Sequence, residues 1–166
     1  MNSSDSAHQF AFTMITGDTK QLSDYAGHPV LIVNTASKCG LTPQYAELEA
    51  LYKKYAELGL VVIGVPSDNF GGQEYAEEAE VVAFTQDKFH ITFPLTSLND
   101  VKGKNAHPFY QWANKKVGLL SAPKWNFHKY LIGKNGELVA SFGSTTSPMS
   151  PKITEAIEDI LKEDSK

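Results

Sequence analysis

The pattern of apolar and polar positions predicts a chain in which strands and helices alternate. Residues 29–34 and 60–65 are apolar, β-branched runs of the length of buried strands. Between them, residues 43–58 place apolar side chains at helical spacing, and Gly59 is expected to end this helix. The apolar positions of the helix are Leu48, Leu51, Tyr52, Tyr55 and Leu58. Strand, helix and strand in this order predict a βαβ unit with parallel strands and a right-handed crossover.

Further elements are expected on both sides of this unit. They are a hairpin of 10–15 and 19–22, a helix over 76–89, a short strand over 92–97, a helix over 108–116 and a hairpin of 130–133 and 137–142. Asn135 and Gly136 are typical of the turn in the second hairpin. The last helix should begin at Pro151, with Ser150 as its N-cap. This order predicts an α/β, thioredoxin-like fold with an N-terminal β-hairpin and an inserted helix-containing segment.

Size and composition favour one compact domain. The 166 residues are 42% hydrophobic and include nine Phe, which suffices for a core. We expect one domain over 1–166, with 1–8 as a flexible tail. The net charge is −4 and the basic residues are dispersed, so we expect no nucleic-acid partner and no stable membrane association. No basic segment followed by an apolar one opens the chain, and a cytoplasmic location is expected.

Cys39 is the only cysteine, so it cannot form a disulfide within the chain. It lies between a predicted strand and a predicted helix whose N-cap and first residue would be Thr42 and Pro43. Free N–H groups and the positive end of the helix dipole lie at such a turn and favour the reactive thiolate. A buried, inert cysteine is the alternative that position alone leaves open.

Three motifs add to this interpretation. Residues 34–42, around Cys39, resemble the active-site segment of the glutathione peroxidase family, and residues 70–74 and 125–129 resemble its second and third motifs. Shorter matches between the motifs and after the third keep the same order, so the resemblance runs from about residue 10 to residue 160. It implies a peroxidase with a thioredoxin fold. The residues that would carry the reaction are Cys39, Gln73, Trp125 and Asn126.

The residue types suit this chemistry. A thiolate can attack the O–O bond of a peroxide, and the amide and indole N–H groups of Gln73, Asn126 and Trp125 are neutral donors for the charge on sulfur or on the leaving oxygen. Taken singly, however, Gln73 is typical of a solvated loop and Trp125 of a core anchor. The source of the leaving-group proton stays open. Lys38 and Lys129 are expected at the surface, where either could lower the pKa of Cys39 or attract an anionic thiol. His128 is expected to be structural or exposed.

Departures from the family pattern bear on the reductant and on the assembly. Many relatives that use thioredoxin carry a second cysteine on the helix after the second motif, and residues 82–86 hold none. External thiols, either glutathione or thioredoxin, must therefore resolve oxidised Cys39. The absence of Arg before Thr145 weakens the expectation for glutathione. The loop before Trp125 is short and resembles that of monomeric members with an open site, so a monomer is expected. No cofactor or metal is expected.

The sequence thus predicts a thiol-dependent, antioxidant peroxidase that reduces hydrogen peroxide and organic or lipid hydroperoxides through a Cys39 sulfenic acid. An alternative is a peroxide sensor or redox relay that passes oxidation to a partner protein through an intermolecular disulfide. A third interpretation is a binding protein of the same fold whose thiol is inert.

Overall fold

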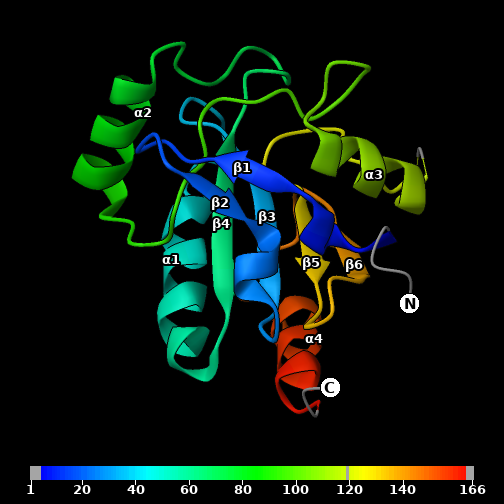
Figure 1. Cartoon of the computed structure of the whole chain (residues 1–166). Helices are drawn as coiled ribbons and strands as arrows, with labels where there is room; N and C mark the ends of the chain where they lie inside the picture. Colours follow the sequence, from blue (N-terminus) through cyan, green and yellow to red (C-terminus); the bar gives the residue numbers. More distant parts are fainter. Residues whose placement is uncertain (1–4, 119, 164–166) are drawn as a thin grey trace.

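A four-stranded mixed sheet forms the centre of the computed structural model, which describes residues 5–118 and 120–163 (Figure 1). Its strands lie in the order β4 (Val61–Pro66), β3 (Val30–Thr35), β5 (Lys129–Ile132) and β6 (Leu138–Phe142). β3 is parallel to β4 and antiparallel to β5, which is antiparallel to β6. This is the expected thioredoxin-like arrangement, with the predicted βαβ unit at one edge.

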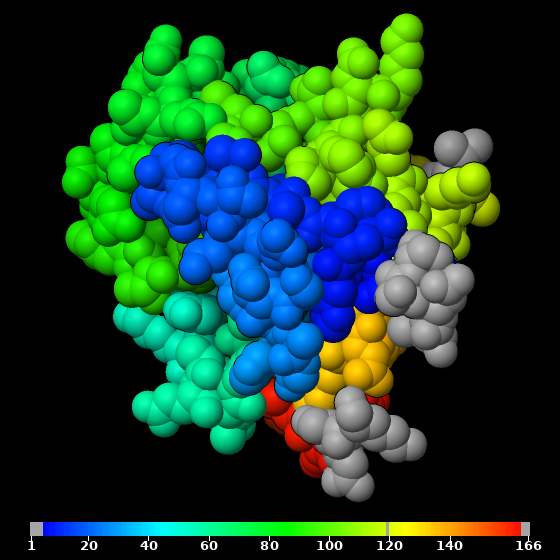
Figure 2. Space-filling model, in the orientation of Figure 1, coloured from blue at the N-terminus to red at the C-terminus, as the bar shows by residue number. Residues whose placement is uncertain are grey.

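Two apolar layers enclose the sheet. Successive residues of β3 point to opposite faces, so Leu31 and Val33 belong to one core and Val30 and Ile32 to the other. The helices α1 (Gln44–Tyr55) and α4 (Pro151–Leu161) cover the first face. The second face is covered by α3 (Pro108–Val117) and by the hairpin of β1 (Ala11–Thr13) and β2 (Thr19–Gln21), which confirms the predicted N-terminal hairpin. Figure 2 shows this hairpin lying across the outside of the molecule.

The segment between β4 and β5 contains helices, as expected, but the first of them is less regular than predicted. The helix predicted over 76–89 is α2 (Glu78–Phe84) followed by one π-helical turn (Thr85–Phe89), and His90 then adopts a left-handed conformation with φ 50°. The predicted strand over 92–97 is wrong: in this stretch Leu95 and Thr96 form only isolated bridges, to Gly64 and Met14. None of the helices in the described residues is both long and apolar enough to cross a membrane.

The ends of α1 differ from the prediction. The helix begins at Gln44, after Pro43, and gives way to a 3₁₀ turn over Ala56–Leu58. Gly59 ends it in the left-handed conformation, with φ 116°, as predicted. Because the tighter 3₁₀ turn changes the helical period, Leu58 leaves the buried face and is 66% exposed.

The described part of the expected flexible tail is packed against the domain. The carboxylate of Asp5 lies 2.9 Å from the ammonium of Lys116, and the Ala7 N–H donates to the Gly136 carbonyl at 2.8 Å. The expectation of a flexible tail is therefore wrong for residues 5–8. Residues 1–4, the rest of that tail, lie outside the described residues.

Replacing the N-cap of α4 should destabilise the fold. The Ser150 hydroxyl accepts the Lys152 N–H at 3.2 Å, and Pro151 occupies the first helical position, as predicted. Ser150→Ala should lower the free energy of unfolding by about 1 kcal/mol in urea titrations. Thr154→Ala, on the same helix, leaves the cap intact and should not lower it. Equal losses in both variants would contradict the assignment of the cap.

Candidate active site

The turn that carries Cys39 connects β3 to α1, and Thr42 sets its shape. The Thr42 hydroxyl accepts the Cys39 N–H at 2.9 Å and donates to the Ala36 carbonyl at 2.8 Å. Thr42 therefore closes the turn and is not the N-cap that the sequence predicted. Cys39 is 9% exposed, and its Sγ accepts a hydrogen bond from the Leu41 N–H at 3.3 Å. The sulfur therefore lies beside a main-chain N–H donor.

The loop that leaves the carboxyl end of β4 brings Gln73 to the Cys39 turn. Gly71 and Gly72 have φ values of 73° and 61°, a conformation that glycine adopts without steric cost. The Lys38 N–H then donates to the Gln73 carbonyl at 2.8 Å. Because Lys38 precedes Cys39, this bond joins the first and second motifs through the main chain.

Trp125 and Asn126 lie just before β5, where Asn34 of β3 anchors them. The Asn34 side-chain amide donates to the Trp125 carbonyl at 3.1 Å, and the Asn34 carbonyl accepts the Phe127 N–H at 2.6 Å. Phe127 has φ 65°, which is uncommon for a residue with a large side chain. The third motif is thus bonded to the strand that leads to Cys39.

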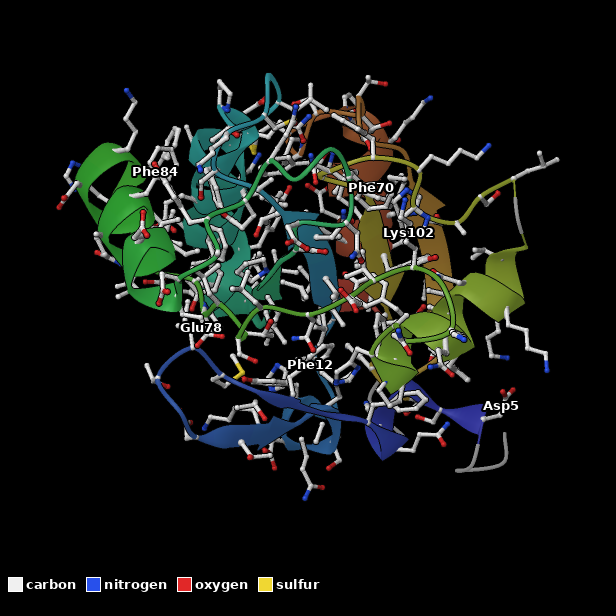
Figure 3. The ribbon with its side chains drawn as sticks, turned by 90° about the horizontal axis from the view of Figure 1, so that it is seen from above. Asp5, Phe12, Phe70, Glu78, Phe84 and Lys102 are labelled. Carbon is white, nitrogen blue, oxygen red and sulfur yellow. The ribbon has the colours of Figure 1, made fainter. Side chains whose placement is uncertain are left out.

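The side chains of the second and third motifs meet. Asn126 is fully buried, and its amide donates to Gln73 Oε1 at 3.3 Å and to the Phe70 carbonyl at 3.4 Å. The Trp125 ring lies 6.2 Å from the Phe70 ring and so close to Gly71 that an added Cβ there would be 3.0 Å from the indole. The ammonium of Lys102 lies over the Phe70 ring, 4.7 Å from the ring centre (Figure 3).

The structure therefore brings Gln73, Trp125 and Asn126 together and ties their segments to the Cys39 turn. The sulfur accepts its hydrogen bond from Leu41, however, and within the described residues no hydrogen bond joins it to these three side chains. The bond from Asn126 uses the Gln73 oxygen and leaves the N–H donors of that amide for another acceptor. Donation from these side chains to sulfur or to a peroxide stays a prediction.

Lys129 is fully buried, and the expected surface position is wrong. Its ammonium donates to Gln44 Oε1 at 2.7 Å and to the Thr146 carbonyl at 2.6 Å, and the carbonyls of Ser144 and Gly143 lie at 3.2 and 3.4 Å. These acceptors join the first residue of α1 to the segment after β6. Because burial disfavours the charge, the pKa of Lys129 falls from its ordinary value of 10.5 to about 7.

The neighbouring titratable groups differ in exposure. His128 is buried, with Nε2 at 2.7 Å from the Ser141 hydroxyl, and burial together with the Lys129 charge lowers its pKa to about 4. His128 is therefore neutral at physiological pH and has a structural role. Lys38 is exposed, as expected, and its ammonium lies 4.4 Å from the centre of the Tyr75 ring. The described residues hold no group of three or more His, Cys, Asp or Glu side chains placed to bind a metal ion.

Glu74 is the residue that sequence reasoning missed. It is buried, and its carboxylate accepts the N–H groups of Ser37 and Tyr75 at 3.1 and 2.9 Å. In the sequence, only its position beside Gln73 in the second motif distinguishes it from the other acidic residues.

Comparison with known proteins places the chain in a family. The sequence pattern of the glutathione peroxidase family matches residues 7–114. The chain belongs to the glutathione peroxidase family. The glutathione peroxidase homolog BsaA of Halalkalibacterium halodurans is 44% identical over 158 residues, which cover 94% of this chain and 99% of that protein. The hydroperoxy fatty acid reductase Gpx2 of Synechocystis is 48% identical over 132 residues, or 80% of this chain and 84% of that one.

A solved structure agrees with this assignment. The crystal structure of Trgpx in apo form matches with a TM-score of 0.78 and 35% identity, covering 97% of this chain and 98% of that one. The resemblance stated from the three motifs is confirmed. As a glutathione peroxidase, the protein is an oxidoreductase that reduces peroxides with electrons from thiols.

The burial of Lys129 should appear in the pH dependence of stability. Because its folded-state pKa of about 7 lies below its ordinary value, the unfolded chain binds more protons between pH 7 and about 10. The stability that Lys129 contributes is therefore fully present above pH 10 and is lost as the pH falls through 7. The free energy of unfolding of the wild type minus that of Lys129→Met should rise from pH 7 to 10, by at most about 1.4 kcal/mol per pH unit. Urea titrations measure this difference, and a constant value would contradict the buried ammonium.

Proposed function

We propose that this glutathione peroxidase reduces hydrogen peroxide and organic or lipid hydroperoxides with Cys39 as the nucleophile. The observation that carries the proposal is the position of the Cys39 sulfur. It lies in the turn after β3, accepts the Leu41 N–H, and belongs to a turn bonded to the segment of Gln73. Trp125 and Asn126 contact that same segment, so the groups needed around a reacting peroxide come from three adjoining loops.

The first half of the reaction oxidises the sulfur. The Cys39 thiolate attacks one peroxide oxygen, an S–O bond forms, and the O–O bond breaks. The departing hydroxide or alkoxide takes up a proton and leaves as water or an alcohol, while sulfur loses two electrons and becomes a sulfenic acid. The amides of Gln73 and Asn126 and the indole of Trp125 act as neutral donors to the oxygen that gains charge.

The second half requires thiols from outside the chain, because Cys39 is the only cysteine. One thiol attacks the sulfenic sulfur and releases water, and a second displaces Cys39 from the mixed disulfide. Two glutathione molecules or one thioredoxin can supply both thiols. The protein needs no cofactor for these steps, and we propose that it acts as a cytoplasmic monomer.

Lipid hydroperoxides fit the surface beside the site. The Trp125 side chain is 36% exposed and packs against Phe70, so an apolar surface is available next to the proposed donors. An acyl chain could lie on it while the hydroperoxide group reaches the sulfur. The relative from Synechocystis is named a hydroperoxy fatty acid reductase, which supports this substrate class.

Replacement of the nucleophile should abolish the activity. Cys39→Ser is expected to consume neither hydrogen peroxide nor cumene hydroperoxide in the presence of thiols, because a serine hydroxyl is not ionised at neutral pH. The circular dichroism spectrum should match that of the wild type. Normal peroxide consumption by the serine variant would show that Cys39 is not the nucleophile.

Removal of a proposed donor should slow the oxidation of Cys39. Gln73→Ala and Trp125→Phe each remove an N–H donor, and by analogy with oxyanion-hole variants the loss is about 10²-fold. This rate is measured by trapping the sulfenic acid with dimedone at set times after mixing and detecting the adduct by mass spectrometry. Leu120→Ala, at a side chain that is 88% exposed, serves as the control and should react at the wild-type rate. Wild-type rates in both donor variants would refute the donor role.

Comparison of electron donors separates enzyme from relay. Steady-state consumption of hydroperoxide should proceed with glutathione or with thioredoxin and its reductase, and the faster donor identifies the reductant. A relay would instead turn over slowly with both and accumulate a covalent complex with a partner protein after peroxide treatment. Non-reducing electrophoresis of peroxide-treated cells detects such a complex.

A further inference from the structure

Glu74 is a buried carboxylic acid to which the peroxidase chemistry above assigns no role. It is 4% exposed, and its Oε1 accepts two main-chain N–H groups, that of Ser37 at 3.1 Å and that of Tyr75 at 2.9 Å. Ser37 precedes Cys39 by two residues, and Glu74 directly follows Gln73. One carboxylate oxygen therefore binds together the segments that carry the proposed nucleophile and the proposed amide donor.

A second hydrogen bond runs beside this one. The N–H of Lys38, the residue between Ser37 and Cys39, donates to the Gln73 carbonyl at 2.8 Å. Two consecutive N–H groups of the Cys39 turn are thus held by two consecutive residues of the Gln73 segment. The bond to the Gln73 carbonyl can form with any side chain at position 73, whereas the bond to Glu74 depends on an oxygen acceptor at the end of its side chain.

The position of this carboxylate is costly for stability. Among the residues that the structure describes, its Oε2 is buried without a hydrogen-bond partner, as are the hydroxyls of Thr35, Ser37 and Tyr45. The Ser37 hydroxyl adjoins the Glu74 carboxyl. Burial raises the pKa of Tyr45, and the nearby charge of Glu74 raises it further. Burial raises the pKa of Glu74 as well, and hydrogen bonds from Ser37 and Tyr75 only partly oppose this. A raised folded-state pKa means that the ionised carboxylate opposes folding at neutral pH, so a neutral side chain would favour stability.

We propose that Glu74 is a positioning residue of the peroxidase reaction, whose carboxylate fixes the Gln73 segment at a set distance from the Cys39 turn. The proposal rests on the proposed roles of Cys39 and Gln73. One carboxylate oxygen that accepts an N–H from each of the two loops suits a contact that must hold them in register. A displacement of about 1 Å between reacting groups can cost about 10²-fold in rate.

Three substitutions at this position separate the effects of side-chain length, carboxylate charge and the hydrogen-bond acceptor. Glu74→Ala removes the acceptor and should slow the oxidation of Cys39 about 10-fold or more. Glu74→Asp keeps the charge on a side chain that is shorter by one methylene, and it should also slow oxidation. Glu74→Gln keeps an oxygen acceptor of the same length, so its rate should stay within about 3-fold of the wild type and its melting temperature at pH 7 should be unchanged or higher. The rate is measured in single turnover with hydrogen peroxide, by dimedone trapping and intact mass.

Glu49 provides a matched control in the same chain. It is a buried carboxylate on α1 that accepts the N–H and the hydroxyl of Thr92 at 2.7 and 2.6 Å and lies 3.7 Å from the Lys53 ammonium, so its hydrogen bonds join other segments than those of the site. Glu49→Ala should lower the melting temperature but leave the rate of Cys39 oxidation unchanged. In all variants, reduction of the preoxidised protein by dithiothreitol should proceed at the wild-type rate, because the proposal concerns only the step with peroxide.

A double-mutant cycle gives the decisive readout. If Glu74 acts by placing Gln73, the variant with both Gln73→Ala and Glu74→Ala should be oxidised almost as fast as Gln73→Ala alone. Additive losses, an equal slowing in Glu49→Ala, or wild-type rates in both Glu74→Asp and Glu74→Ala would overturn the proposal. If Glu74→Ala does not fold, Glu74→Asp decides alone. A wild type that forms no Cys39 sulfenic acid would refute the proposed function itself, which is a distinct result.

Discussion

The site depends on how β3 pairs with its two neighbours. Because β3 is parallel to β4, the carboxyl ends of both strands lie at the same end of the sheet. Because β5 is antiparallel to β3, the amino end of β5 lies there too. Cys39 follows β3, Gln73 follows β4, and Trp125 with Asn126 precedes β5. Asn34 then holds the third motif beside β3, because its side-chain amide donates to the Trp125 carbonyl and its own carbonyl accepts the Phe127 N–H. Convergence of the three motifs is thus a property of the sheet topology.

Much of this topology follows from local signals in the sequence. The two apolar runs give β3 and β4 to within a residue, and the helical segment between them favours a parallel pair. Asn135 and Gly136 give the turn between β5 and β6, where Gly136 has the expected positive φ of 85°. Ser150 and Pro151 mark the start of α4 because the first turn of a helix has its own chemical requirements. The family motifs then locate the three loops of the site.

Long-range contacts decide what the sequence could not show. Lys129 follows a histidine at the start of a strand and so has the local pattern of a solvated charge. It is buried because the fold brings Gln44, 85 residues away, and the carbonyls after β6 to its ammonium. Thr42 has the residue type of an N-cap, yet it bonds to Cys39 and Ala36 because the chain makes a tight turn before α1. Leu58 and residues 92–97 depart from their patterns where irregular backbone replaces regular elements.

Three buried ionisable groups lie near the strand ends where the site forms, whereas a fourth, Glu49, lies on α1. Burial lowers the pKa of Lys129 to about 7 and that of His128 to about 4, and both residues lie within three positions of Asn126. Glu74, whose pKa is raised, follows Gln73. Each shift means that burial of the charged form reduces stability, so the free energy that offsets them must come from elsewhere. The aliphatic and aromatic side chains that are buried on the two faces of the sheet supply it. A stable core can therefore support an edge whose polar groups are arranged for chemistry more than for stability.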